Sequence, residues 1–429
     1  MTKFRTLDHP IMATIAWDPQ RPAEWINDHI LMAAATSNVY LIIGEEGDVV
    51  INSGAASQGA AIRNKFETLL GRALNVRNLI FTQSHPDHTG GWQAFADGQT
   101  EIIAQQNFHQ VMAERRLLAP FFRTRYANVI AAMLAGMPRN LGLDAEDPDQ
   151  VSTFPNTHEF TLSGRRFQLK SMPSGETLDA LAVWLPDEKT VFTGNWAGAI
   201  HGALPNFYTA RGDRQRSVPG WLAECRDLLA REPELLITGH EQPIIGRERI
   251  RADLMTVYKA VSYIHDETVE AMNAGVDVAT IQASTKLPAG VTIREGRCPP
   301  HWIARAIYEE YAGWFHQDRT SEIYTTPQSA IWPELVESMG GPEKVAERAL
   351  DLLSEGEAEK ALHFIEMAAF CKPASRKVLE TQIAVFETLA DQTEGKVFDL
   401  LGWLEGRIMA AKEALAQHTQ SRPTHTTKQ

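Results

Sequence analysis

The chain has 429 residues, 44% hydrophobic and 22% charged, which is typical of a soluble globular protein with room for two or three domains. Its formal net charge is −13, from 41 basic and 54 acidic side chains, and this argues against nucleic acid or an anionic membrane surface as the main partner. The three cysteines are far apart and odd in number, which excludes a disulfide framework and a cysteine-based zinc site.

The N-terminal segment carries no targeting signal that we recognise. Residues 1–19 lack the apolar run and small-residue cleavage site of a signal peptide. The most apolar later segment, residues 128–138, is too short to span a bilayer and ends at proline. We therefore expect a cytoplasmic protein without a membrane partner.

The first predicted elements form a strand, helix and strand series. Residues 36–56 contain two β-branched-rich runs joined by a Glu-Glu-Gly-Asp turn, which predicts a β-hairpin. Residues 59–74 have a helical period, with four apolar residues on one face, namely Ile62, Phe66, Leu69 and Leu70. Residues 76–83 form an apolar strand that leads into a loop rich in histidine. This order predicts an α/β fold with the loop at a strand's C-terminal end, where such sheets usually place ligands.

The middle of the chain is predicted to be a helical stretch followed by further strands. Residues 107–140 look helical and mix arginines with Phe121, Phe122 and Tyr126, which line an apolar substrate channel or form an ordinary helix core. Strand-turn-strand patterns return up to about residue 246. From about residue 250 the pattern becomes a series of amphipathic helices. We place an α/β catalytic domain at 1–250, an all-α domain at 251–415 and a disordered tail at 416–429.

Residues of metal-ligand type gather at the predicted strand ends. The loop supplies His85, Asp87 and His88, and later strand ends supply Glu176, Asn195 and His240. Zinc takes imidazole and carboxylate ligands, and catalytic sites keep one position for water. We expect Gly90 and Gly91 to permit the sharp turn that such a loop requires. The pattern predicts a metal site.

The segment "TQSHPDHTGG" at residues 82–91 resembles the His-x-His-x-Asp-His signature of the metallo-β-lactamase superfamily, with Gln83 at the first histidine. The hairpin ending in "INSG" resembles the early strand pair of that fold. The resemblance implies a metallo-β-lactamase αβ/βα sandwich.

Within that superfamily, the sequence is most similar to the alkyl sulfatases, or type III sulfatases. Glu176 stands where they have a glutamate after a Pro-Gly turn, and Asn195 stands where they have a second, metal-bridging glutamate. "NFYTARG" at residues 206–212 resembles their Asn-x-x-Thr-x-Arg-Gly element. Residues 308–315 resemble the start of their helical, TPR-like dimerisation domain, which implies a homodimer.

The resemblance implies two metal positions, one of them altered. One metal would be held by Gln83, His85 and Glu176, the other by Asp87, His88 and His240, with Asn195 at the bridging position. An amide is a weaker, neutral ligand than imidazole or carboxylate. We therefore expect zinc, as one or two ions, with the first position weakened.

The implied activity is hydrolysis, in which metal-bound hydroxide cleaves an organic sulfate or a related anionic ester. The predicted catalytic residues are Asp87, which would orient or deprotonate the water, and Asn195. Arg211 would hold the anion with help from neighbouring substrate-binding residues, namely Asn206, Tyr208 and Thr209. Two alternatives stay open. One is another hydrolase of this fold, such as a lactonase, thioesterase or β-lactamase-like enzyme. The other is a non-catalytic, dimeric binding protein with a degraded metal site.

Overall fold

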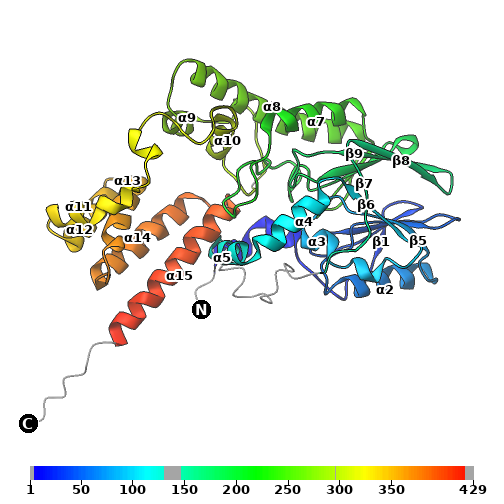
Figure 1. Ribbon diagram of the computed structural model, residues 1–429, viewed down its shortest axis with the longest axis horizontal. Coiled ribbons are helices and arrows are strands. Elements are labelled where there is room, and N and C mark those ends of the chain that lie inside the picture. The colour runs from blue at the N-terminus through cyan, green and yellow to red at the C-terminus, as the bar shows by residue number, and fades with distance from the viewer. Residues whose placement is uncertain (1–3, 130–145, 295, 421–429) are drawn as a thin grey trace, which may run out of the picture. The chain divides into compact units, whose positions relative to one another are not determined.

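The computed structural model describes residues 4–129, 146–294 and 296–420 (Figure 1). Within these residues the chain divides into two compact units. One contains residues 10–125 and 146–311, and the other contains residues 4–9, 126–129 and 312–420. The domain boundaries at 250 and 415 remain a prediction.

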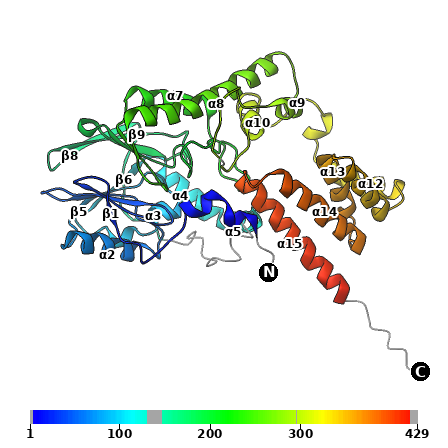
Figure 2. The ribbon, with the colours of Figure 1, turned by 180° about the vertical axis from the view of Figure 1, so that it is seen from behind.

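The first unit is built on two β-sheets, visible in Figure 2. The first sheet runs in chain order through seven strands, β1 (Glu24–Trp25), β2 (Ile30–Ala33), β3 (Val39–Ile42), β4 (Asp48–Ile51), β5 (Val76–Ile80), β6 (Glu101–Gln105) and β7 (Ser152–Phe154). The second sheet has six strands, in the order β13 (Ile244–Ile245), β12 (Leu235–Thr238), β11 (Thr190–Gly194), β10 (Leu181–Leu185), β9 (Arg165–Ser171) and β8 (Thr157–Leu162). The predicted hairpin is confirmed, because β3 and β4 pair antiparallel.

Along each strand, side chains point alternately to the two faces of the sheet, and this alternation builds the core layers of the fold. In β3, Tyr40 and Ile42 pack in the core shared by the two sheets, whereas Val39 and Leu41 pack on the outer face of their own sheet. The shared core takes Val183 from β10, while Trp184, the next residue, joins the core on the other side of the second sheet. Successive side chains of a strand point to opposite faces, so strands that are buried throughout must lie in a sandwich covered on both sides.

Helices cover both outer faces of the sandwich. Ile62 and Phe66 of α2 (Gly59–Leu70) and Phe108 of α4 (Phe108–Leu117) pack on the first sheet. The second sheet is covered by α7 (Val218–Ala230), α8 (Arg247–Asn273), α9 (Val278–Ser284) and α10 (Pro300–Ala312). Of the four apolar residues predicted on one face of this helix, Ile62 and Phe66 are buried, whereas Leu69 is exposed near the end of α2. The predicted αβ/βα sandwich is confirmed.

The second unit is helical, as expected. Its main helices pack in sequence, α11 (Trp332–Ser338), α12 (Pro342–Ser354), α13 (Ala358–Phe370), α14 (Arg376–Gln392) and α15 (Phe398–Gln420). Apolar side chains at helical spacing, such as Val345, Ala349 and Leu352 of α12, form its core. The predicted tail is wrong for residues 416–420, which continue α15, and its remainder at 421–429 lies outside the described residues. None of the described helices is long and apolar enough to cross a membrane.

The predicted helical stretch at 107–140 is confirmed as far as it is described. It consists of α4 and α5 (Ala119–Val129), and the part from residue 130 onward lies outside the described residues. Phe121 of α5 is exposed rather than packed in a helix core. This favours the channel interpretation for that residue.

Candidate metal centre and active site

The histidine loop is held at the C-terminal edge of the sandwich by backbone hydrogen bonds. After β5, the carbonyl of Thr82 accepts from the N–H of Leu181, 2.9 Å away in the second sheet. The carbonyl of His88 accepts from the N–H of Ser53 at 2.7 Å, at the end of the β3–β4 hairpin. Four-residue helix α3 (Pro86–Thr89) then carries Asp87 and His88. The two sheets thus fix this loop between them.

The glycines after the motif have a different role from the one we predicted. Gly90 and Gly91 have φ values of −63° and −87°, which any residue can adopt. A Cβ at Gly91 would lie 2.2 Å from the carbonyl oxygen of Ser53, and one at Gly90 would lie 2.7 Å from the backbone nitrogen of Ala56. Glycine is required here because two backbone segments approach closely, not because the turn needs a left-handed conformation.

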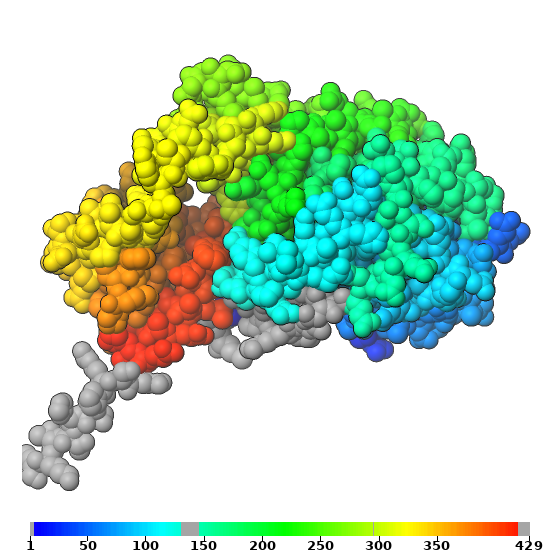
Figure 3. Space-filling model, viewed as in Figure 1, coloured from blue at the N-terminus to red at the C-terminus, as the bar shows by residue number. Residues whose placement is uncertain are grey.

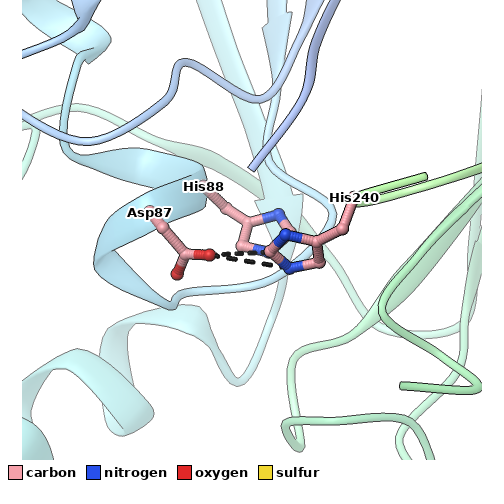
Figure 4. Close-up of side chains that lie close together, drawn as sticks. All are labelled: Asp87, His88 and His240. Carbon is pink, nitrogen blue, oxygen red and sulfur yellow. Dashed lines mark ion pairs between the residues drawn. The ribbon is translucent and has the colours of Figure 1, made fainter. Parts of the chain in front are cut away.

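Asp87, His88 and His240 converge on one point (Figure 4). Asp87 Oδ2 lies 3.6 Å from His88 Nε2 and 3.7 Å from His240 Nε2. The two imidazole rings stand at 88° to each other. Two ligands of one tetrahedral zinc ion, each about 2.0–2.2 Å from it, lie about 3.3–3.5 Å apart. The spacing and the donor set of these three residues therefore fit a metal ion.

Neighbouring groups orient both imidazoles. His240 Nδ1 lies 2.7 Å from the carbonyl oxygen of Thr36, so Nδ1 carries the proton and Nε2 keeps its lone pair. Ser37 Oγ donates to the carbonyl of Gly239 at 3.1 Å and lies 3.1 Å from Nδ1 and 3.2 Å from Nε2 of His88, so it contacts this ring without selecting one nitrogen. Such outer partners commonly fix the tautomer of metal-binding histidines.

Burial and charge suit this trio to hold a cation. Burial lowers the pKa of His88 to about 4, so the ring is neutral at pH 7. Burial disfavours the charge of Asp87, but His88 and His240 outweigh it, and the pKa of Asp87 lies below its ordinary value. An ionised Asp87 and a neutral His88 ring result.

The remaining predicted ligands form a separate cluster around the buried carboxylate of Glu176. Glu176 Oε2 accepts from Asn195 Nδ2 at 2.7 Å and from Gln83 Nε2 at 2.9 Å, and lies 3.4 Å from His85 Nδ1. Its other oxygen, Oε1, accepts from Arg211 Nη2 at 2.8 Å. Burial favours the neutral acid, but His85 and Arg211 outweigh it and hold the pKa of Glu176 well below its usual range.

Asn195 connects this cluster to the trio. Its Nδ2 also lies 2.9 Å from His240 Nε2. Asn195 directly follows β11, beside the end of β12, and Gly239 makes room for it because a Cβ there would lie 2.0 Å from Asn195 Oδ1. All seven predicted metal-site residues are therefore near one another, as two groups of different character.

The predicted substrate-binding residues mostly bind other parts of the protein. Arg211 pairs with Glu176 and, through Nε, with Asp213 at 2.6 Å. Thr209 Oγ1 accepts from the N–H groups of Gly212 and Asp213, which closes the turn after "NFYTARG". Tyr208 is half-buried with Arg305 above its ring, and Asn206 is buried and accepts from Arg216 through its carbonyl. These contacts leave the roles of the four residues as predictions.

A cavity of about 360 Å³ opens beside the Glu176 cluster. Its lining includes His85, Glu176 and Arg216, and its apolar part comes from Val111, Leu118, Phe121, Phe122 and Leu178. In Figure 3 the cyan surface of α4 and α5 lies next to the green segment that contains Arg214, which pairs with Glu114 at 2.5 Å. The cavity combines an apolar wall with charged side chains.

The sequence reading missed Arg216, which is 6% exposed and lines this cavity. Its Nη1 donates to the carbonyl of Asn206, whereas Nε and Nη2 have no hydrogen-bond partner among the described residues. Asp213 Oδ2, 3.6 Å from Nη2, supplies a partial counter-charge. The run of arginines at 211–216 is the only sequence signal that could have pointed to it, and it does not tell which arginine is buried.

Two family models match parts of the chain. Residues 33–240 match the model of the metallo-beta-lactamase superfamily, so the sandwich is a metallo-β-lactamase fold. Residues 282–399 match the model of the alkyl sulfatase dimerisation family. The resemblance to alkyl sulfatases inferred from the sequence is therefore confirmed.

Individual relatives agree with this assignment. A linear primary-alkylsulfatase of Pseudomonas sp. (strain ATCC 19151) is 28% identical over 341 residues, covering 74% of this chain and 63% of the relative. An alkyl/aryl-sulfatase of Saccharomyces cerevisiae is 22% identical over 409 residues, covering 88% of this chain and 61% of the relative. The chain thus spans less than two thirds of the length of these curated relatives.

A solved structure shares the fold over nearly the whole chain. The stereoselective inverting sec-alkylsulfatase Pisa1 from Pseudomonas sp. superposes with a TM-score of 0.76 at 19% identity, covering 95% of this chain and 67% of that chain. The fold class predicted from the sequence, a sandwich followed by a helical region, is the one found there.

Proposed function

We propose that this protein is a metal-dependent hydrolase that cleaves an organic sulfate ester with an apolar chain. The observation that carries the proposal is the convergence of Asp87, His88 and His240 at the spacing of zinc ligands. The relatives that it resembles are named as alkyl sulfatases, which supports the sulfate ester over the alternative substrates.

We assign the following roles to the parts of the site. When bound, the metal supplies a Lewis acid and makes water acidic enough to ionise near neutral pH. Asp87 is ionised and accepts or orients the proton of the attacking water. Asn195 Nδ2, between Glu176 and His240, holds the two halves of the site in register. The apolar wall binds the chain of the ester and keeps water away from it.

We propose that Arg216 is the main partner of the anionic head group. Arg211, the residue predicted for this role, is already paired with two carboxylates. Arg216 faces the cavity with Nε and Nη2 unused among the described residues, and a buried guanidinium in that state gains most from a bidentate anion. Arg211, Asn206 and Thr209 then act by shaping the loop that presents Arg216, and Tyr208 packs behind it.

Three further points belong to the proposal. The metal is zinc, because imidazole and carboxylate ligands suit it and the trio leaves room for water. The protein is a homodimer, which the match to the dimerisation family and the exposed side chains of Trp314 and Tyr324 support. It works in the cytoplasm, where its three free cysteines would stay reduced.

The test is release of inorganic sulfate from alkyl sulfates of increasing chain length, with the full chain metal-free and after zinc addition. We expect turnover only with zinc, increasing with chain length until the cavity is full. Arg216→Gln should lower kcat/KM by about 10–100-fold, since a charge-assisted hydrogen bond contributes about 1.5–3 kcal/mol. Arg214→Gln, which breaks a more exposed pair in the same wall, is the matched control and should change little.

Other outcomes would select between the alternatives. Zinc-dependent turnover of lactones or thioesters without sulfate release would support another hydrolase of this fold. Zinc binding without turnover of any of these substrates would support the binding-protein interpretation.

A further inference from the structure

The cluster around Glu176 differs from the trio in the distances between its polar atoms. Asn195 Nδ2 and Gln83 Nε2 lie 2.7 and 2.9 Å from Glu176 Oε2, and Gln83 Nε2 lies 3.0 Å from His85 Nδ1. These are hydrogen-bond lengths, shorter than the roughly 3.3–3.5 Å that separates two ligands of one zinc ion. Only the 3.4 Å between His85 and Glu176 has ligand spacing, and two ligands are too few for a site.

The types of atom that face Glu176 also argue against a second metal ion there. The atoms that Gln83 and Asn195 direct at Glu176 are amide nitrogens, which donate hydrogen bonds and do not bind metal ions. Rotating the amide of Asn195 would place its oxygen 2.7 Å from a carboxylate oxygen of Glu176, where the two oxygens would repel each other. The observed orientation is therefore the one that the surrounding groups favour.

Positive charge at Glu176 is already supplied by the protein. Arg211 Nη2 lies 2.8 Å from Glu176 Oε1. Because Arg211 is only 8% exposed, solvent screens this ion pair little. A second metal ion bound to Glu176 would have to displace or approach this guanidinium. The bridging position holds neutral Asn195 instead of an anion, so it does not help to offset that repulsion.

We propose that this chain holds a single metal ion, at Asp87, His88 and His240, and that the second position is filled by a hydrogen-bonded cage. The cage consists of Glu176 with Gln83, Asn195 and Arg211, and it supplies a fixed charge arrangement beside the reacting ester where a second ion would stand. This inference rests on the proposed function only for the metal at the trio, and it does not depend on which ester is cleaved.

The experiment is a count of zinc per chain, by elemental analysis and native mass spectrometry, after the full-length protein is loaded with excess zinc and the unbound metal is removed. We expect one equivalent for the wild type and none for His88→Ala. The double variant Gln83→His and Asn195→Glu, which restores the ligand types of the alkyl sulfatases, should hold two equivalents. Adding His88→Ala to it should lower the count by one.

A further variant keeps the test decisive if the double variant does not fold. Glu176→Gln removes the only carboxylate of the cage, and it should leave one equivalent of zinc bound with an unchanged Kd. Two equivalents in the wild type, or loss of zinc in Glu176→Gln, would overturn the inference. No zinc in the wild type would overturn the proposed function as well, whereas one equivalent without sulfate release would overturn only the proposed substrate.

Discussion

Two halves of one site, joined by the 2.9 Å contact between Asn195 Nδ2 and His240 Nε2, compensate a buried charge in different ways. In the trio, Asp87 faces two imidazoles whose Nε2 atoms are 3.6 and 3.7 Å away, and no lysine or arginine is among these contacts. In the cage, Glu176 receives direct hydrogen bonds from two amides and a guanidinium. A buried carboxylate needs compensation, and the trio leaves that role to an ion while the cage provides it from within the chain.

The difference teaches that ligand-type residues do not by themselves make a metal site. Both halves contain histidine and a carboxylate on loops at the same edge of the sandwich. What separates them is the distance between polar atoms and whether those atoms donate or accept. The following predictions test this contrast, from the largest effect to the smallest.

Removing a ligand from the trio should have the largest effect. We expect His88→Ala to weaken zinc binding by more than about 100-fold, because loss of outer partners alone costs about 10–100-fold. His85→Ala, next to Glu176 and Gln83 of the cage, is the matched control and should keep its zinc. Competition with a chromophoric chelator measures both values. Equal losses in the two variants would mean that the halves share one binuclear site.

Much of the trio was predictable from the sequence, because it depends on local order along the chain. The hairpin at 36–56, the helix at 59–70 and the strand before His85 follow from hydrophobic periods of two and 3.6. His88 follows β5 of the first sheet and His240 follows β12 of the second, so the packing of the two sheets brings these side chains together although they are far apart in sequence.

The cage could not be predicted in the same way. Glu176 and Arg211 are 35 residues apart, and the sequence gives no sign that this arginine pairs with Glu176 rather than with a substrate. Whether the amides of Gln83 and Asn195 point nitrogen or oxygen at Glu176 is decided by all their neighbours together. The role predicted for Gly91 was also wrong, because the close approach of Ser53 is a tertiary contact that the sequence around the glycine does not specify.

Weakening the support of the trio should have the next largest effect. We expect Ser37→Ala to raise the Kd for zinc by about 10–100-fold, because Ser37 Oγ orients the His88 ring. Ser84→Ala removes a hydroxyl that donates to Asp179 at 2.9 Å on the cage side, and should leave the Kd unchanged. The same chelator competition applies. A larger effect from Ser84 than from Ser37 would contradict our division of the site.

Breaking the cage should change stability rather than metal binding. We expect Glu176→Gln to lower the free energy of unfolding of the metal-free protein by about 1–3 kcal/mol, because Arg211 loses a buried partner but keeps Asp213. Glu234→Gln, which removes an exposed partner of Arg247, should cost clearly less, because solvent screens that pair. Urea unfolding at pH 7 measures both. A cost for Glu176→Gln no greater than that of the exposed control would mean that the cage does not compensate the carboxylate.

The smallest expected effect is the pH dependence of the difference in unfolding free energy between the wild type and Glu176→Gln. The Arg211 and His85 side chains hold the folded-state pKa of Glu176 well below its usual range, against the effect of burial. Its stabilising contribution is therefore complete above the unfolded-state pKa of about 4.3 and declines as the pH falls toward the folded-state value.

The difference in unfolding free energy between wild type and Glu176→Gln should thus be equal at pH 7 and pH 5. At pH 3.5 it should be smaller by about 1 kcal/mol, since each pH unit below the unfolded-state pKa removes about 1.4 kcal/mol. Urea titrations of the metal-free proteins at the three pH values measure this. A difference that stays constant down to pH 3.5 would mean that the folded-state pKa of Glu176 is not lowered, and a cage of neutral hydrogen bonds would replace the charged one that we infer.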